Sequence, residues 1–499
     1  MNRRDFLKVS GTSMASVMIS GCGAEFLGGQ EHFDTIPFRT IDLNKGEKAK
    51  LELDDGSLVN LQLLDVQHRQ DSVCGAVREV RLQVKVDGET VELSSGNYTL
   101  PVAAGKFKLD CPVTYGYYAA SDIDRWGLAK HARLRVWPRE SAILPAGTFL
   151  YPVKQRWLAS DTQMSNEPVY VDGGERPGLR KIFYHSALDF GEAERLVEVV
   201  SATDGLVVSR GTGVLDAHKN KPIMPRYDVV YVLDERGWYI RYSHLYQIDE
   251  AIRTGGHIGA GQRIGLVGKE GSSGGWSHLH FEITSMQPSG KWGNQDAYPF
   301  VWEAYRREYQ PMMMAVARPH KVVRVGEEVV LDGSKSWGAG GQLSYQWLLS
   351  DGMKSSGATV KKIYAEPGTF CETLQISDHN GNADYDFCKV IVFGGENAEI
   401  IPPSIHACCF PAQNVKVGQR ITFKVRSFTK EQTGETMDFG DESKAVTVYS
   451  DGNRKWWARD GYAVTDHVYD KPGDYIVRAE CRDKAGHVGE TRLLVRVSV

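Results

Sequence analysis

The chain has 499 residues, 41% of them hydrophobic and 24% charged, a composition typical of a globular protein with roughly three domains. Its formal net charge of −4 and the lack of a dense lysine/arginine stripe predict no nucleic-acid partner. Glycine, tyrosine and tryptophan are plentiful and long helical periodicities are scarce, so the sequence predicts a mostly β, multidomain fold.

In the first segment, residues 1–22, we expect a targeting signal rather than a folded element. Arg3 and Arg4 precede a short, weakly apolar run that ends in ISGC. This pattern resembles a bacterial twin-arginine signal with a lipoprotein cleavage box, and a soluble N-terminal helix is the alternative. The resemblance implies an exported lipoprotein, facing the periplasm or the cell surface, that is attached to a membrane through lipidated Cys22. Because Gly23 follows rather than aspartate, we expect the outer membrane.

The next segment, residues 34–150, is expected to form an N-terminal β-rich domain. The runs KAKLELDD, LVNLQLLDV, EVRLQVKV, FKLDCPVTYGYY and ARLRVWP are strand-like and are separated by turns such as VDGE and SSGN. No motif in this domain indicates a function, which leaves open whether it acts as a lid or positions a substrate.

Residues 151–310 are expected to form an antiparallel β domain with one helix, around Pro299 to Tyr309. Its last strand contains the sequence HLHFE, in which His278 and His280 are two residues apart. On a strand such residues point to the same face, and two adjacent imidazoles make a poor core but a good metal or acid–base site.

Upstream residues supply partners for these histidines. His185 and Asp189 are four residues apart in FYHSALDFG, so that on a strand they share a face. In YIRYSHL, His244 alternates in phase with Tyr242, which predicts a further inward-facing histidine. An isolated H-x-H is more often structural, but five such residues within one β domain favour a metal centre.

The blocks H-x-x-x-D, Y-x-H-L, G-Q-x-I-G and H-L-H-F-E occur in that order over about a fifth of the chain. They resemble the lysostaphin-type zinc endopeptidases, which cut peptidoglycan peptides. The resemblance implies a Zn²⁺ site whose ligands are His185, Asp189 and His280. It implies acid–base catalytic roles for His244 and His278.

Two features depart from the family pattern. Ala187 stands where H-x-G-x-D usually has glycine, which matters only if the backbone needs a positive φ there. Residues 216–228 replace a usual short glycine turn. Neither change removes a proposed ligand. The resemblance therefore implies a peptidoglycan endopeptidase, with an inactive regulator of the same fold, or a wall-binding scaffold lipoprotein, as the alternative.

The C-terminal part contains two similar units, residues 315–394 and 400–499. Each has an aromatic-x-x-Pro-Gly-x-aromatic pattern followed by a strand and a D-x-x-G turn. Both resemble PKD domains, which are immunoglobulin-like sandwiches, and this implies spacers or modules that bind protein or glycan. Trp456 and Trp457 in the second unit are either a binding platform or two packed aromatics.

Seven cysteines follow the signal segment. Cys371 and Cys388 flank the turn signal DHNG at nearly equal distances, which predicts a hairpin disulfide between them. Other pairings remain open, and the odd number leaves one thiol free.

Overall fold

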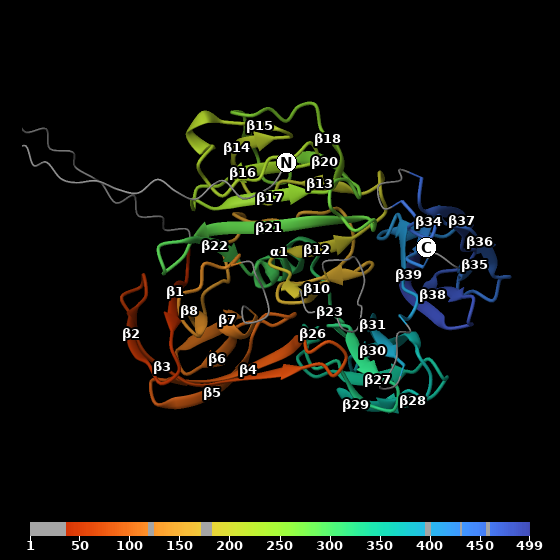
Figure 1. Ribbon diagram of the computed structural model, residues 1–499, viewed down its shortest axis with the longest axis horizontal. Coiled ribbons are helices and arrows are strands. Elements are labelled where there is room, and N and C mark those ends of the chain that lie inside the picture. The colour runs from red at the N-terminus through yellow and green to blue at the C-terminus, as the bar shows by residue number, and fades with distance from the viewer. Residues whose placement is uncertain (1–35, 118–123, 171–181, 395–400, 430–431, 456–459) are drawn as a thin grey trace, which may run out of the picture. The chain divides into compact units, whose positions relative to one another are not determined.

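The computed structural model of the chain is dominated by β-strands (Figure 1) and describes residues 36–117, 124–170, 182–394, 401–429, 432–455 and 460–499. In these ranges no helix has the length and apolar character that crossing a bilayer requires. The export signal expected at residues 1–22, including Cys22, lies outside the described residues, as do Trp456 and Trp457.

The N-terminal region consists of two antiparallel sheets. One has the order β1 (Arg39–Leu43), β8 (Ala132–Pro138), β7 (Phe107–Thr114), β6 (Val102–Ala104). The other has the order β2 (Lys48–Glu52), β3 (Leu58–Gln70), β4 (Val77–Val86), β5 (Glu89–Ser94). In β4, apolar residues from Val80 to Val86 alternate with polar ones and are buried. They pack with Leu109 and Leu134 of the first sheet in one core, as the alternation predicts.

The N-terminal region also packs into the core of the middle region. Phe38 stacks on Phe300, with ring centroids 5.9 Å apart, and contacts Trp137 at 4.8 Å. The buried guanidinium of Arg135 lies over the Phe300 ring and donates a hydrogen bond of 2.9 Å to the carbonyl oxygen of Asp296. The core is therefore continuous across position 150, where the sequence predicts a domain boundary.

A large antiparallel sheet forms the middle region. Its described strands run in the order β15 (Gly213–Val214), β14 (Gly205–Arg210), β16 (Val230–Leu233), β17 (Tyr239–Ser243), β21 (His278–Met286), β12 (Leu188–Gly191), β9 (Thr162–Gln163), with β19 (His257–Ile258) paired to β14 and β22 (Trp292–Gln295) paired to β21. Figure 1 shows β21 as a long strand between β17 and β12. β21 is therefore an interior strand, with a partner on each side.

Smaller elements complete this region. A second antiparallel sheet has the order β13 (Glu198–Val200), β20 (Arg263–Val267), β18 (Leu245–Ile248), and β10 (Pro168–Tyr170) pairs with β11 (Ile182–Tyr184). The expected helix is α1 (Tyr298–Tyr309), with proline in its first turn and Gln310 in a left-handed conformation at its end. Its buried face packs into the core of the large sheet. Short 3-10 turns occur at Tyr115–Tyr117 and Asp216–His218.

The two C-terminal units each contain two packed groups of strands. The first unit, residues 315–394, contains β24 (Lys321–Arg324), β25 (Glu328–Asp332), β26 (Trp337–Gly338), β27 (Ser344–Leu348), β28 (Lys354–Ser356), β29 (Thr359–Ile363), β30 (Gly368–Ser377) and β31 (Ala383–Phe393); β26 pairs with β23 (Met313–Met314), just upstream. The second, the C-terminal module of residues 400–499, contains β32 (Ile405–Phe410), β33 (Val415–Lys416), β34 (Arg420–Ser427), β35 (Gln432–Asp438), β36 (Val446–Val448), β37 (Ala463–Val468), β38 (Gly473–Asp483) and β39 (Val488–Ser498). Thr369 of β30 pairs with Gly489 of β39, so that one sheet extends through both units.

The expected disulfide between Cys371 and Cys388 is wrong. The register of β30 and β31 pairs Cys371 with Lys389 and Cys388 with Glu372. Because side chains alternate along a strand, the two thiols lie on opposite faces of the sheet and in different cores. Cys371 and Cys388 are both free thiols.

Candidate metal and acid–base site

The site is centred on the register between β12 and β21. Asp189 pairs with His280 and Gly191 pairs with His278, while Ser243 of β17 pairs with His280 from the other side. Leu279 and Phe281 point to the opposite face and are fully buried in the core. The alternation of HLHFE therefore directs both histidines to one face, as the sequence predicts.

His185 lies beside Asp189 and His280, but it is not on the same strand as Asp189, contrary to the expectation. His185 and Asp189 do not share a strand, since β11 ends at Tyr184 and β12 begins at Leu188. The chain leaves one sheet and enters another between them. Ala187, in the position where glycine is usual, is buried but is not among the described residues with a positive φ, so its Cβ causes no backbone strain.

The ligand atoms of His185, Asp189 and His280 converge. The distance from His185 Nε2 to His280 Nδ1 is 3.2 Å and to Asp189 Oδ1 is 3.3 Å, and His280 Nδ1 lies 2.8 Å from Asp189 Oδ1. Two ligands at about 2.05 Å from a tetrahedral zinc ion are about 3.3 Å apart. The spacing and the N, N, O donor set therefore fit a zinc ion, and these three side chains form the candidate metal cluster among the described residues.

Electrostatics favour a cation at this point. Burial disfavours the charged form of Asp189, but the neighbouring imidazoles, His185 first, hold its pKa well below the usual value. Burial also opposes protonation of His280, yet Asp189 beside it raises its pKa. The cluster therefore contains an ionised carboxylate that attracts positive charge into a buried place.

Glu282 determines which nitrogen of His280 faces this cluster. Its Oε2 lies 3.2 Å from His280 Nε2 and 3.3 Å from Nη1 of Arg241. Burial opposes ionisation of Glu282, but His280 and Arg241 hold its pKa far below the usual value. An ionised Glu282 accepts the Nε2 hydrogen, and the Nδ1 lone pair of His280 is left to face Asp189.

His278 lies beside the cluster without joining it. Its Nε2 is 3.4 Å from Asp189 Oδ2, and its Nδ1 donates to the carbonyl oxygen of Trp276 at 3.1 Å. The indole of Trp276 also stacks on the His278 ring, with centroids 4.0 Å apart. Burial lowers the pKa of His278 to about 4, so the ring is neutral at pH 7 and Nε2 can accept a proton.

His244 reaches the site through a backbone feature that strand alternation does not predict. Its expected phase with Tyr242 is wrong, because Tyr242 points into the core and pairs with Phe281. β17 ends at Ser243, and a φ of +66° at His244 directs its ring to the opposite face, toward His278. The ring centroid lies 4.6 Å from that of His278.

The hydrogen bonds of His244 leave one nitrogen available. Its Nδ1 donates to the carbonyl oxygen of Glu270 at 2.6 Å, and its backbone N–H donates to Asp228 Oδ2 at 3.0 Å. Burial, with the nearby His278 and His280, lowers its pKa well below the usual value. His244 is therefore a second neutral imidazole whose Nε2 can accept a proton.

Residues 183–292 match the family model described as peptidase family M23, over about a fifth of the chain. The chain contains an M23 peptidase domain. All five residues of the site fall within it, and the resemblance to lysostaphin-type peptidases is confirmed at the level of this domain. A family model for the PKD domain matches residues 310–392, which confirms the first C-terminal unit as a PKD domain. No curated protein matches the chain.

Solved structures similar to this chain include several peptidases. The catalytic domain of the prophage-encoded M23 protein EnpA from Enterococcus faecalis is 23% identical, covers 24% of this chain and 82% of its own, and has a TM-score of 0.18. Lysostaphin from Staphylococcus simulans is 16% identical, covers 47% of this chain and 90% of its own, and has a TM-score of 0.23. A putative glycyl-glycine endopeptidase from Ruminococcus gnavus is 23% identical, with 32% and 60% covered and a TM-score of 0.20.

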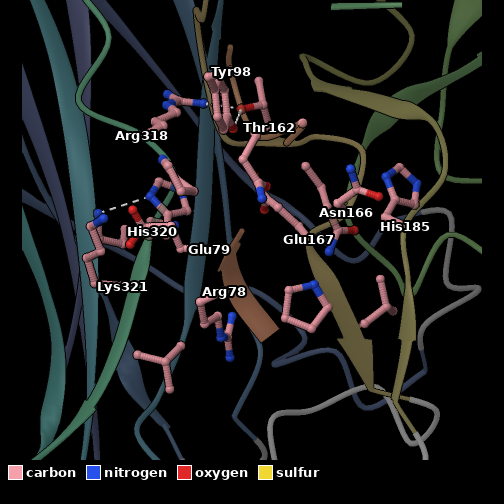
Figure 2. Close-up of a pocket in the computed structure, with 18 of the residues that line it drawn as sticks. Arg78, Glu79, Tyr98, Thr162, Asn166, Glu167, His185, Arg318, His320 and Lys321 are labelled. Carbon is pink, nitrogen blue, oxygen red and sulfur yellow. Dashed lines mark hydrogen bonds between the residues drawn. The ribbon is translucent and has the colours of Figure 1, made fainter. Parts of the chain in front are cut away.

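A cavity of about 1540 Å³ is lined by all five residues of the M23 site. Figure 2 shows His185 on one side of this cavity and His320 and Lys321 of the PKD domain on the other. Arg78 and Glu79 of the N-terminal region also line it. The space next to the M23 site is therefore lined in part by segments of the chain that the peptidase motifs do not include.

The C-terminal module holds the loop that precedes β21. Tyr462 Oη accepts the backbone N–H of Ser277 at 2.9 Å, and Asn453 Nδ2 donates to the carbonyl oxygen of Gly274 at 3.1 Å. Arg426 donates to the carbonyl oxygen of Gly275. The loop that carries Trp276 to His278 is thus fixed from outside the M23 domain.

Three residues that contact the five site residues were not predicted from the sequence. Glu282 continues the alternation of His278 and His280 and could have been found from that signal. Trp276, next to the G-S-S-G-G run, and Arg226, in the loop that replaces a glycine turn, gave no comparable signal. Their positions depend on contacts between segments far apart in the sequence.

Proposed function

We propose that the chain is a zinc-dependent endopeptidase that hydrolyses peptide bonds of peptidoglycan. The observation that carries the proposal is the convergence of His185, Asp189 and His280, with ligand-atom distances of 2.8 to 3.3 Å, beside two neutral imidazoles. The M23 match supports the reaction class and the wall-peptide substrate. The complete ligand set favours an enzyme over an inactive regulator or a wall-binding scaffold.

The site side chains have separate roles in the proposed reaction. A zinc ion held by the three ligands would supply a Lewis acid that polarises the scissile carbonyl and makes water more acidic. Nε2 of His278, whose Nδ1 is fixed by Trp276, accepts the proton of the attacking water. That proton is then passed to the leaving amine, either from Nε2 of His278 itself or by way of Nε2 of His244, which is a second acceptor.

The rest of the chain has supporting roles in this proposal. Lipidated Cys22 anchors an exported protein to a membrane, with the outer membrane as the proposed location. The C-terminal units act as spacers or bind protein or glycan. The cavity shared by the M23 and PKD domains gives these units a place beside the substrate.

Digestion of purified sacculi tests the proposal. The full chain, loaded with zinc, should release peptides whose masses identify one type of cleaved bond. A chelator should stop the release, and added zinc should restore it. Zinc-loaded protein that releases nothing would contradict the proposed substrate.

A further inference from the structure

Arg226 lies at the edge of the M23 site, in the loop that departs from the family pattern. Its Nε and Nη2 both donate to the carboxylate of Asp228, with Nη2 at 2.6 Å from Oδ2. The Asp228 side chain is fully buried and also accepts the backbone N–H of His244. Arg226 and His244 are therefore fixed by the same carboxylate.

The guanidinium is held close to the catalytic groups. Its Nη2 lies 3.2 Å from His244 Nδ1, and it packs over Gly271, where a Cβ would collide with it. Tyr227, the next residue, accepts the backbone N–H of Gly271 at 3.0 Å and donates to Glu270. These contacts attach the Arg226 loop to the loop that leads to β21 and preorganise the guanidinium.

The contacts leave one nitrogen of Arg226 without a hydrogen-bond partner in the described part of the chain. Among the described residues Nη1 has no hydrogen-bond partner, and the side chain is 27% exposed where it lines the cavity with His244 and His278. A guanidinium has five N–H donors in a planar fork that matches a carboxylate. A fixed arginine that lines the cavity and keeps one nitrogen unbonded is suited to binding an anion of that shape.

We propose that Arg226 binds a free carboxylate of the peptide substrate, on a residue next to the cleaved bond. This inference rests on the proposed peptidase function and adds a substrate class to it: peptides with a free carboxylate near the scissile amide. His244 lies between Arg226 and the other site histidines, so the carboxylate is bound on the His244 side of the cavity. Arg226 is thereby a specificity-determining residue.

The test compares three synthetic peptides that contain the bond identified by sacculus digestion. One has its native carboxylates, and each of the others has one flanking residue amidated. For the wild-type chain, kcat/KM should fall about 10- to 100-fold for one amidated peptide, the loss expected for a charge-assisted hydrogen bond. In the Arg226→Gln variant, the ratio of kcat/KM for the native peptide to kcat/KM for that amidated peptide should fall to about one. The exposed Arg253, outside the cavity, gives the matched control, and Arg253→Gln should keep the wild-type ratio.

The outcomes separate this inference from the proposed function. If Arg226→Gln lowers cleavage of all three peptides equally, Arg226 only supports the fold and the inference is wrong. The single variant leaves the buried carboxylate of Asp228 without its guanidinium partner, and the double variant Arg226→Gln/Asp228→Asn removes that carboxylate as well. The double variant should also cut the native and the amidated peptide with similar kcat/KM. If the wild-type chain cuts all three peptides equally, the inference about Arg226 is wrong but the proposed peptidase function is unaffected. A chain that cuts none overturns both.

Discussion

Glu282 is the residue on which the orientation of His280 depends. Its carboxylate lies 3.2 Å from His280 Nε2, on the side of the ring away from Asp189. Partners of this kind raise the basicity of a ligand and fix its tautomer, and their loss typically weakens metal binding 10- to 100-fold. The interaction with Arg241 holds Glu282 in turn.

We therefore expect Glu282→Gln to weaken zinc binding by about one to two orders of magnitude, because a neutral amide is a poorer acceptor than a carboxylate. Titration against a chromogenic chelator measures this affinity. Glu250→Gln, at an exposed glutamate, is the control and should bind zinc as the wild type does. Equal zinc affinity in the Glu282→Gln variant and the wild-type protein would show that Glu282 does not orient the ligand.

The positions of some site residues could be predicted from the sequence, and those of others could not. His278 and His280 could be placed on one face because strand alternation is a local rule. His244 could not, since continued alternation would have buried it with Tyr242, and only its φ of +66° brings it to the site. Nothing in YIRYSHL marks where the strand ends, because that conformation is fixed by distant partners such as Asp228.

The loop of residues 268–277 is the element whose position sets the geometry of His278. It is rich in glycine and serine, so its own residues restrict its conformation little. Tyr462, Asn453 and Arg426 of the C-terminal module bind its backbone instead. The fixed loop then stacks Trp276 on His278.

Tyr462→Phe should therefore lower kcat by about 10- to 100-fold while zinc binding is retained. The substitution removes the acceptor of the buried Ser277 N–H, and small displacements of a catalytic group are costly. Activity on sacculi and zinc content measured on the same preparation check this. Tyr449→Phe is the control, since Tyr449 is 73% exposed. Equal losses of activity in both variants would contradict a role for the loop contacts.

At the scale of elements, sequence periodicity located most strands and the helix α1. The break between β11 and β12 was missed, because FYHSALDFG has no glycine or proline at the point where the chain changes sheets. The hairpin of β30 and β31 was recognised, but its register was not. A displacement of one residue moves a side chain to the other face, and it separates Cys371 from Cys388.

In the whole molecule, the substrate space is built from several regions. The M23 domain supplies the five site residues, and the N-terminal region and PKD domain supply other parts of the cavity wall. Local motifs predicted the chemistry because each block carries its own residues. They could not predict that other regions line the cavity, because this depends on packing between distant segments, such as those that carry Phe38 and Phe300.

The zinc content of three purified proteins tests the central claim most directly: the full chain, His278→Ala and His280→Ala, each equilibrated with zinc, freed of unbound metal and analysed for its elements. The account predicts one zinc per chain in the wild type and in His278→Ala, and none in His280→Ala, because His280 is a metal ligand and His278 is not. Both variants should lose activity on sacculi, His278→Ala by at least about 100-fold through loss of proton transfer. A wild-type chain without zinc, or a His280→Ala variant that keeps one ion per chain, would contradict the account.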